Sequence, residues 1–182
     1  GELGRGGMGV VFEAWDQQRR QRCALKWLRT GGEATEEDVA RFTREARLQA
    51  SLRDYPGIAT VFDFGTVPGS GELYCVLEFV DGVSLERKIR GKELSRPESA
   101  RVVARVARAL EYAHDRGIVH RDVKPSNVLV SAKGMVRLVD FGIARTLDGS
   151  ARLTATGIMI GTPGFMAPEQ IQALPDLGPA VD

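Results

Sequence analysis

Three side chains that can take part in phosphoryl transfer lie within six residues of this sequence, at Asp122, Lys124 and Asn127. The Asp122 carboxylate can accept a proton, and the Lys124 ammonium can hold a phosphoryl oxygen. Asn127 and the later Asp140 offer the hard oxygen ligands that Mg²⁺ prefers. Pro125 prevents this stretch from continuing as a helix. These residue types suit phosphoryl transfer between oxygens, where positioning and charge neutralisation do most of the catalysis.

A helix is expected to lead into this loop. Residues 97–116 keep apolar side chains at helical spacing, Ser95 with Glu98 forms a cap pattern, and Gly117 is expected to end the helix. The apolar positions are Val102, Val103, Val106, Ala109, Leu110 and Ala113. The other face carries Arg101, Arg105, Arg108 and Asp115. These arginines are most simply interpreted as a solvated stripe.

A glycine-rich stretch near the start has the spacing G-x-G-x-x-G-x-V over residues 4–11. Residues 10–15 are largely β-branched or aromatic and favour a strand, whereas a dinucleotide-binding loop must open into a helix. The glycines are therefore expected in a hairpin whose backbone N–H groups can cover phosphates. No Gly-Lys-Ser/Thr is present, which excludes a Walker-type loop. Taken alone, the stretch is also compatible with a plain turn.

The next elements predicted are a strand and a helix. Lys26 lies inside a short apolar run typical of a strand, where a lysine is usually a solvated edge residue. Residues 36–52 predict a helix that starts with a capping box of Thr35 and Asp38, and Glu45 lies mid-helix. The apolar stripe of this helix is Val39, Phe42, Ala46 and Ala50.

The middle of the chain predicts two strands, at 59–64 and 73–79, separated by a turn rich in proline and glycine. Ser84 then begins a short helix that Gly91 ends.

The composition is that of a globular protein, with 43% apolar and 27% charged residues among 182. A net charge of +1 gives no reason to expect nucleic-acid or membrane binding. No apolar run approaches the roughly 20 residues that span a bilayer. Cys23 and Cys75 lie apart in strand-like runs, which fits buried thiols in a reducing compartment better than a disulfide or a zinc site.

Together these motifs resemble the eukaryotic-type protein kinases, and most closely the bacterial serine/threonine subgroup. The resemblance rests on the glycine hairpin, the strand lysine, the loop His120–Asn127, the triplet Asp140–Gly142 and the closing triplet Ala167–Glu169, in that order. Val123, where the common pattern has Leu, is the one departure in the loop. In this order and at these separations, a chance occurrence is negligible.

The resemblance implies an α+β, bilobal protein kinase-like fold. Residues 1–79 would form an N-lobe with an antiparallel sheet and one helix, and residues 80–83 the hinge. Residues 84–182 would form a mainly helical, truncated C-lobe with an activation segment at 140–169. Because the family continues with further helices, we expect these 182 residues alone to be poorly soluble or inactive. The sequence beyond either end stays open.

The resemblance also implies the roles of the loop residues. Asp122 would be the base that accepts the proton of a Ser or Thr hydroxyl. Lys124 would neutralise the γ-phosphoryl group, and it is typical of the Ser/Thr type of loop. Asn127 and Asp140 would coordinate Mg²⁺, for which Mn²⁺ could substitute. His120 is expected to be structural.

The ATP site implied by the resemblance involves both predicted lobes. Lys26 would contact the α- and β-phosphates and pair with Glu45. The other ATP-binding residues would be Leu3, Gly4, Gly6, Gly7, Gly9, Val11, Ala24, Glu78, Val80 and Leu129. Gln49, one helical turn after Glu45, stands where active kinases usually have an apolar residue.

Regulation would act through the activation segment. Arg121 would pair with a phosphate there, and Thr154 and Thr156 resemble the autophosphorylated pair of bacterial receptor-type kinases. Thr162 would be structural, with its hydroxyl bonded to Asp122 or Lys124.

The expected function is therefore that of a non-specific serine/threonine protein kinase, controlled by autophosphorylation through self-association. Its expected partners are ATP and protein substrates, and its expected location is cytoplasmic, alone or as the cytoplasmic domain of a membrane-anchored receptor. The alternative is a nucleotide-binding pseudokinase or scaffold, which would have lost the lysine, the base or the metal-binding Asp; none is lost here. Lys124 and the activation segment disfavour a small-molecule phosphotransferase.

Overall fold

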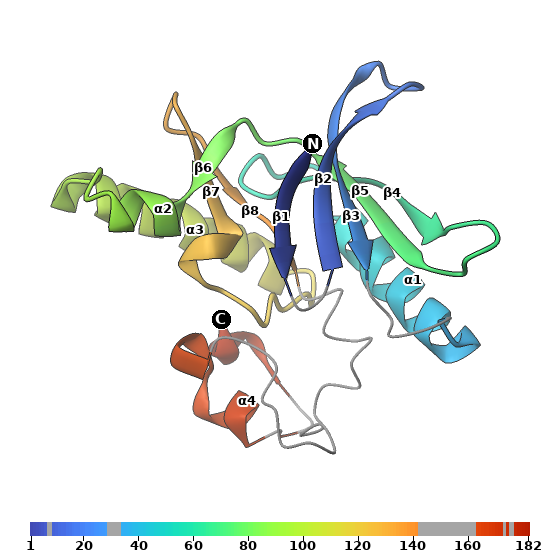
Figure 1. The fold of residues 1–182 in the computed structure, drawn as a ribbon. Coiled ribbons are helices and arrows are strands. Elements are labelled where there is room, and N and C mark those ends of the chain that lie inside the picture. Colours follow the sequence, from blue (N-terminus) through green and yellow to red (C-terminus); the bar gives the residue numbers. More distant parts are fainter. Residues whose placement is uncertain (7–8, 29–33, 142–162, 173, 175–176) are drawn as a thin grey trace. The chain divides into compact units, whose positions relative to one another are not determined.

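The structure is a computed structural model that describes residues 1–6, 9–28, 34–141, 163–172, 174 and 177–182 (Figure 1). The chain forms two compact units. The first contains the described residues of Gly1–Arg53 and Thr60–Phe79, and the second those of Asp54–Ala59, Val80–Gly142 and Gly161–Asp182. The lobe and hinge bounds expected from the resemblance stay predictions.

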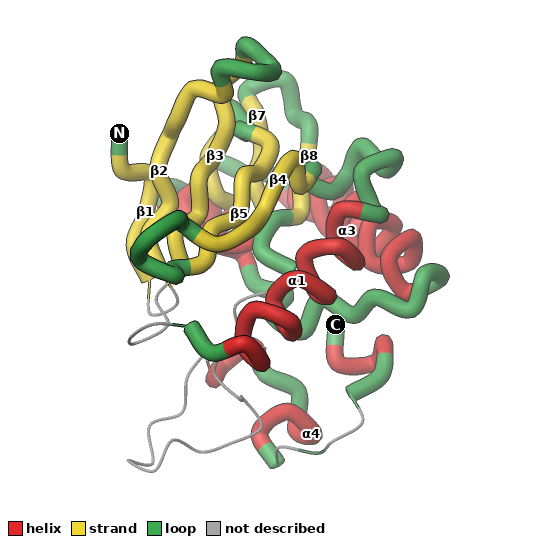
Figure 2. The backbone as a smooth tube through the Cα atoms, turned by 90° about the vertical axis from the view of Figure 1, so that its right-hand side faces the viewer, coloured by secondary structure: helices red, strands yellow, loops and turns green. Residues whose placement is uncertain are grey.

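The first unit is built on a five-stranded antiparallel sheet with strand order β1-β2-β3-β5-β4, drawn in yellow in Figure 2. Its strands are β1 (Glu2–Gly6), β2 (Gly9–Asp16), β3 (Gln21–Leu28), β4 (Val61–Thr66) and β5 (Leu73–Glu78). Gly6 pairs with Gly9 at the end of the β1–β2 ladder, so the glycine-rich stretch lies in a hairpin as predicted. Gly9 has a φ of +148°, and a Cβ there would lie 2.0 Å from the carbonyl oxygen of Trp27, so this position requires glycine.

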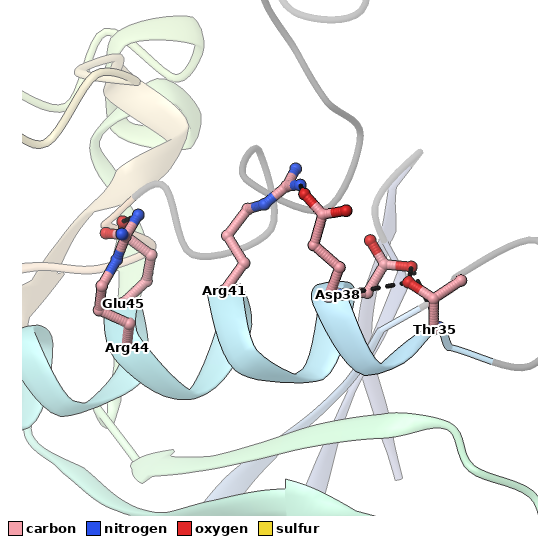
Figure 3. A network of polar contacts seen from close by, with 6 residues as sticks. Thr35, Asp38, Arg41, Arg44 and Glu45 are labelled. Atoms are coloured by element: carbon pink, nitrogen blue, oxygen red, sulfur yellow. Dashed lines mark hydrogen bonds and ion pairs between the residues drawn. The ribbon is translucent and has the colours of Figure 1, made fainter.

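Helix α1 (Glu36–Ala50) packs against the sheet of the first unit (Figure 2). It begins at the predicted capping box, in which the Asp38 backbone N–H donates to Thr35 Oγ1 at 3.2 Å (Figure 3). Its buried Phe42 and Ala46 share a core with Leu28, Leu73 and other strand residues. The predicted apolar stripe is therefore confirmed, and its burial holds the helix to the sheet.

The second unit carries a three-stranded antiparallel sheet, in the order β6-β7-β8, and three α-helices in its described part. The strands are β6 (Gly82–Ser84), β7 (Val128–Ser131) and β8 (Val136–Leu138), and the helices are α2 (Leu85–Arg90), α3 (Arg96–His114) and α4 (Pro168–Ile171). Short 3₁₀ turns occupy Pro125–Asn127, Pro163–Phe165 and Pro179–Val181. Strand β6 was not predicted, because three residues are too few to show an alternating pattern.

Helix α3 starts at the predicted capping box, where Ser95 N–H donates to a Glu98 carboxylate oxygen at 2.8 Å. The buried positions are Val102, Ala109, Leu110 and Ala113, as predicted. Val103 was predicted with them, but it is 63% exposed. Each residue turns the helix by about 100°, which carries Val103 away from the face centred on Val102.

The two cysteines are buried and do not form a disulfide bond, as expected from their positions in apolar strands. Among the described residues, no helix combines the length and apolar character needed to cross a membrane.

Candidate active site

The side chains singled out in the loop after α3 converge on the Asp122 carboxylate. Asn127 Nδ2 donates to Asp122 Oδ2 at 2.9 Å and to the Asp122 carbonyl at 2.8 Å. Lys124 Nζ lies 2.8 Å from the same Oδ2. Asn127 is buried at the end of the 3₁₀ turn that begins at Pro125. The proline therefore starts the turn that positions the Asn127 side-chain amide. The carboxylate is thus oriented by two donors from its own loop.

The β7–β8 hairpin brings Asp140 to the same end of the sheet as Asn127. Val128 pairs with Leu138, and the Val139 N–H donates to the Asn127 carbonyl at 2.9 Å. Asp140 follows with a φ of +60°, a left-handed conformation that Asp tolerates better than most residues. The two residues predicted to bind a cation, Asn127 before β7 and Asp140 after β8, therefore lie at the same end of the β7–β8 hairpin.

His120 is fully buried and structural, as expected. Its Nε2 donates to the Val139 carbonyl at 2.9 Å, its Nδ1 accepts the Asp122 N–H at 3.2 Å, and its ring centroid lies 4.5 Å from that of Phe141. These bonds fit the neutral ring. Burial, the largest cause, lowers the pKa of His120 below its ordinary value. His120 thus ties the loop to the segment that carries Asp140.

The lowered pKa of His120 predicts a loss of stability in mild acid. Below the unfolded-state pKa of about 6.5, the unfolded chain binds a proton that the folded state resists, so the free energy of unfolding falls as the pH drops. The melting temperature should fall between about pH 7.5 and about pH 5.5, and it should fall less steeply in His120→Gln. Parallel pH profiles for the two proteins would contradict this.

Asp182 is a site residue that the sequence analysis missed. Its fully buried carboxylate accepts the backbone N–H of His120 at 2.7 Å and that of Arg121 at 2.6 Å, and His114 Nε2 lies 2.8 Å away. Arg121 has a φ of +66°, so the chain turns sharply immediately before Asp122. Asp182 therefore fixes the turn that aims the proposed base. It stands 61 and 62 residues from the groups it binds, so no local pattern could have revealed it.

Three other predicted residues of the second unit, Arg121, Val80 and Leu129, occupy defined positions, and Gln170, which was not predicted, contacts the first of them. Gln170 Nε2 donates to the Arg121 carbonyl at 2.8 Å, a second bond that holds the turn before Asp122. Leu129 is in β7 and pairs with Ser84 and Arg137. Val80 is partly buried in this unit. Four predicted residues lie outside the described part of the chain: Gly7, Thr154, Thr156 and Thr162.

In the first unit, Lys26 stands in the centre of β3, paired with Val11 of β2 and Cys75 of β5. Because alternate residues of a strand share a face, Lys26 lies on the same face as Ala24 and Leu28. Those two residues belong to the core that contains the buried side chains of α1. The strand therefore presents its lysine on the side of the sheet that α1 covers.

Glu45 is on α1, with 23% of its side chain exposed, and its carboxylate lies 3.5 Å from the guanidinium of Arg44 (Figure 3). The ion pair of Glu45 with Lys26 stays a prediction. Glu78 ends β5, and its N–H donates to the Thr60 carbonyl at 2.8 Å.

The remaining predicted ATP-binding positions lie on the β1–β2 hairpin. Leu3, Gly4 and Gly6 belong to β1 and are exposed, whereas Gly9 and Val11 belong to β2. The contacts of these residues with ATP stay predictions.

Gln49 is buried on α1, and neither its Nε2 nor its Oε1 has a hydrogen-bond partner among the residues that the structure describes. A buried amide group without a partner destabilises a fold by about 1–3 kcal/mol. We therefore expect Gln49→Leu to raise the melting temperature, by roughly 2–4 °C for each kcal/mol gained. Gln49→Glu is the control, and it should lower the melting temperature because it places a charge at the same buried position. A lower melting temperature for Gln49→Leu would contradict this expectation.

We compared the chain with known protein families, sequences and structures. Residues 1–182 match the family model of the protein kinase domain. The chain is 41% identical over 184 residues to the serine/threonine-protein kinase PknA of Mycobacterium tuberculosis, covering 99% of this chain and 42% of PknA. It is 42% identical over 177 residues to PknF of the same organism, covering 93% of this chain and 37% of PknF.

The solved structure of the M. tuberculosis PknI kinase domain matches the fold, with a TM-score of 0.78 and 31% sequence identity. The match covers 100% of this chain and 65% of that domain. The chain therefore spans less than half the length of these curated relatives and about two thirds of the solved domain.

Proposed function

Because this chain belongs to the protein kinase domain family, we propose that its protein transfers the γ-phosphoryl group of ATP to serine and threonine hydroxyls of other proteins. The observation that carries the proposal is the convergence of Lys124 and Asn127 on the Asp122 carboxylate. The names of the relatives, serine/threonine-protein kinases, support the same choice of acceptor.

The proposed reaction is a single displacement at phosphorus. The acceptor oxygen forms a bond to the γ-phosphorus while the bond to the β–γ bridging oxygen breaks, and ADP leaves with the electron pair. Asp122 accepts the proton of the hydroxyl as it attacks. Lys124, whose ammonium lies 2.8 Å from Asp122 Oδ2, stabilises the negative charge of the transferring group.

The residues present fit a divalent cation held by Asn127 and Asp140. Asn127 Nδ2 is engaged by two oxygens of Asp122, which leaves its Oδ1 as the atom available to a cation. Together with the Asp140 carboxylate this is an all-oxygen set of the kind that Mg²⁺ prefers, with Mn²⁺ as a substitute. When bound, the cation would neutralise charge on the phosphate oxygens.

Most of the residues proposed to hold the nucleotide belong to the first unit, and Val80 and Leu129 belong to the second. Lys26, paired with Glu45, would contact the α- and β-phosphates, and the glycine hairpin would cover the phosphates with its backbone N–H groups. Glu78 and Val80 would bind the adenine edge through their backbones. Support comes from the position of Lys26 on the face of the sheet that α1 covers.

Regulation by autophosphorylation is part of the proposal. Thr154 and Thr156 would accept the γ-phosphoryl group of ATP in a reaction catalysed by a second copy of the protein, with ADP released. Arg121 would pair with the resulting phosphate through charge-assisted hydrogen bonds. Support comes from Arg121, which directly precedes Asp122, so an ordered activation segment would be linked to the base. A cytoplasmic location is proposed because two buried cysteines that form no disulfide bond suit a reducing compartment.

The test is transfer of labelled γ-phosphate from ATP by the intact protein, with analysis of the labelled amino acids. We expect label on Ser and Thr, its loss on chelation of divalent cations and its return with Mg²⁺. Asp140→Asn should lose transfer, whereas Asp54→Asn, an exposed acid, should not. Nucleotide binding without any transfer would overturn the proposal in favour of the pseudokinase alternative.

A further inference from the structure

Three arginines form a row along the exposed side of α3. Arg101, Arg105 and Arg108 are spaced by four and three residues, so they share one helix face over about 10 Å. Arg105 Nη1 donates to the Gly134 carbonyl in the turn between β7 and β8. Exposed Lys133 precedes Gly134 in that turn. These four cations are called the basic stripe below.

Unlike several other arginines, those of the basic stripe form no ion pair within the described residues. They differ from other unpaired exposed arginines, such as Arg20, Arg47 and Arg53, in sharing one face of a helix. Elsewhere, arginine guanidinium groups pair with carboxylates at 2.7–3.0 Å; such pairs are Arg5–Glu2, Arg19–Asp16, Arg41–Glu37 and Arg90–Glu86. Among the described residues, no ion pair includes a member of the stripe. Two exposed acids lie at helical spacing from the ends of the row, Glu98 three residues before Arg101 and Glu111 three residues after Arg108. The lowered pKa of Glu98 is due first to its bonds with Ser95 and in smaller part to Arg101.

Like charges at helical spacing repel one another and destabilise the helix that carries them. Three arginines in a row, with acids only at its two ends, are better explained by an anionic ligand than by the stability of the fold. The sequence alone favours a solvated face for these arginines. The structure adds the bond from Arg105 to the β7–β8 turn that carries Lys133, and among the described residues no carboxylate forms an ion pair with the row.

We propose that the basic stripe is a docking surface for an acidic, Asp/Glu-rich segment of a protein partner. A guanidinium group binds a carboxylate through two parallel hydrogen bonds, which a lysine cannot match. An extended segment presents side chains on one face about every 6.8 Å, so two or three carboxylates fit along a row of this length.

The shape of the stripe favours a peptide over a membrane surface. Membrane-binding helices combine a broad basic cluster with apolar side chains that enter the lipid. On α3 the strongly exposed apolar residue is Val103, two residues after Arg101 and therefore about 200° around the helix from it. It points away from the stripe and cannot anchor the same face.

Docking would also serve catalysis, and this part rests on the proposed function. The stripe and Asp122 belong to the same compact unit. An acceptor hydroxyl on the same chain as a docked acidic segment would reach the base at a raised effective concentration. The segment would therefore lower the KM of a protein substrate without changing kcat.

Binding is tested first, because it does not depend on phosphotransfer. A short labelled Asp/Glu-rich peptide without Ser, Thr or Tyr is titrated with the intact protein and followed by fluorescence anisotropy. The stripe variant carries Arg101→Glu, Arg105→Glu and Arg108→Glu. The control carries Arg20→Glu, Arg47→Glu and Arg53→Glu, which are exposed arginines of the first unit and give the same net charge.

We expect the stripe variant to bind the peptide at least about tenfold more weakly than the wild type and the control, and added salt to weaken wild-type binding. Arg101→Gln with Arg108→Gln keeps the Arg105–Gly134 bond and should lose part of the affinity without a change in melting temperature. Equal loss in both triple variants, or no loss in either, would overturn the proposal.

Two further experiments distinguish an acidic protein segment from other anionic ligands, and the docking proposal from the proposed kinase function. Stripe-dependent binding to phosphatidylserine vesicles or to single-stranded RNA, with none to the peptide, would overturn the choice of an acidic protein segment. With an acceptor peptide that carries an acidic tail, the stripe variant should show a raised KM and an unchanged kcat. Absence of transfer by every protein, with peptide binding intact, would overturn the kinase assignment and leave the docking surface standing.

Discussion

Replacing Asp122 with Asn is expected to remove nearly all phosphotransfer while leaving the fold and nucleotide binding in place. A positioned base contributes a factor of about 10²–10⁴ to the rate, and an amide cannot accept the hydroxyl proton. The amide has the shape of the carboxylate and keeps an oxygen that can accept from Asn127 Nδ2, which donates to Asp122 Oδ2 at 2.9 Å in the wild type. The loss should therefore appear in kcat rather than in the melting temperature.

The measurement is kcat at saturating ATP and acceptor, together with nucleotide affinity and melting temperature. Asp115→Asn is the matched control, because Asp115 is an exposed acid at the end of α3. Labelling by Asp122→Asn at the wild-type rate would show that another group accepts the proton, and the assignment of the base would then be wrong.

Asp182→Ala is expected to have the largest effect on stability. The substitution leaves the backbone N–H groups of His120 and Arg121 without their acceptor in a buried site. Each buried donor left without a partner destabilises the fold by about 1–3 kcal/mol, so the total is about 2–6 kcal/mol. That is a large share of the roughly 5–15 kcal/mol that stabilises a whole domain. The turn before Asp122 would also lose its position, so activity should fall as well.

The change is measured by denaturant unfolding and by kcat on the same preparations. Asp182→Asn keeps one acceptor oxygen and should recover part of both quantities, whereas Asp115→Ala, the control, should change neither. An unfolding midpoint for Asp182→Ala within error of the wild type would show that the carboxylate does not hold the turn.

Local contacts were the part of the molecule that the sequence could predict. The capping boxes at Thr35 and Ser95 join residues three apart, and the glycine hairpin closes between Gly6 and Gly9. The loop is equally local, since Asn127 and Lys124 reach a carboxylate no more than five residues away. In each case the residue types and their spacing were enough to predict the contact, because residues so close in sequence can form a hydrogen bond in only a few chain conformations.

Contacts between distant segments were decided only by the tertiary structure. Asp182 binds the turn before the base from more than 60 residues away, and Arg105 reaches the carbonyl of Gly134 across 29 residues. The burial of Gln49 without partners and the exposure of Val103 also depend on what packs against each helix. The sequence by itself therefore determined the family, the capped helices, the glycine hairpin and the residues of the loop. Packing determined which backbone groups anchor that loop and which charges stay unpaired, because both depend on segments that meet only in the folded chain.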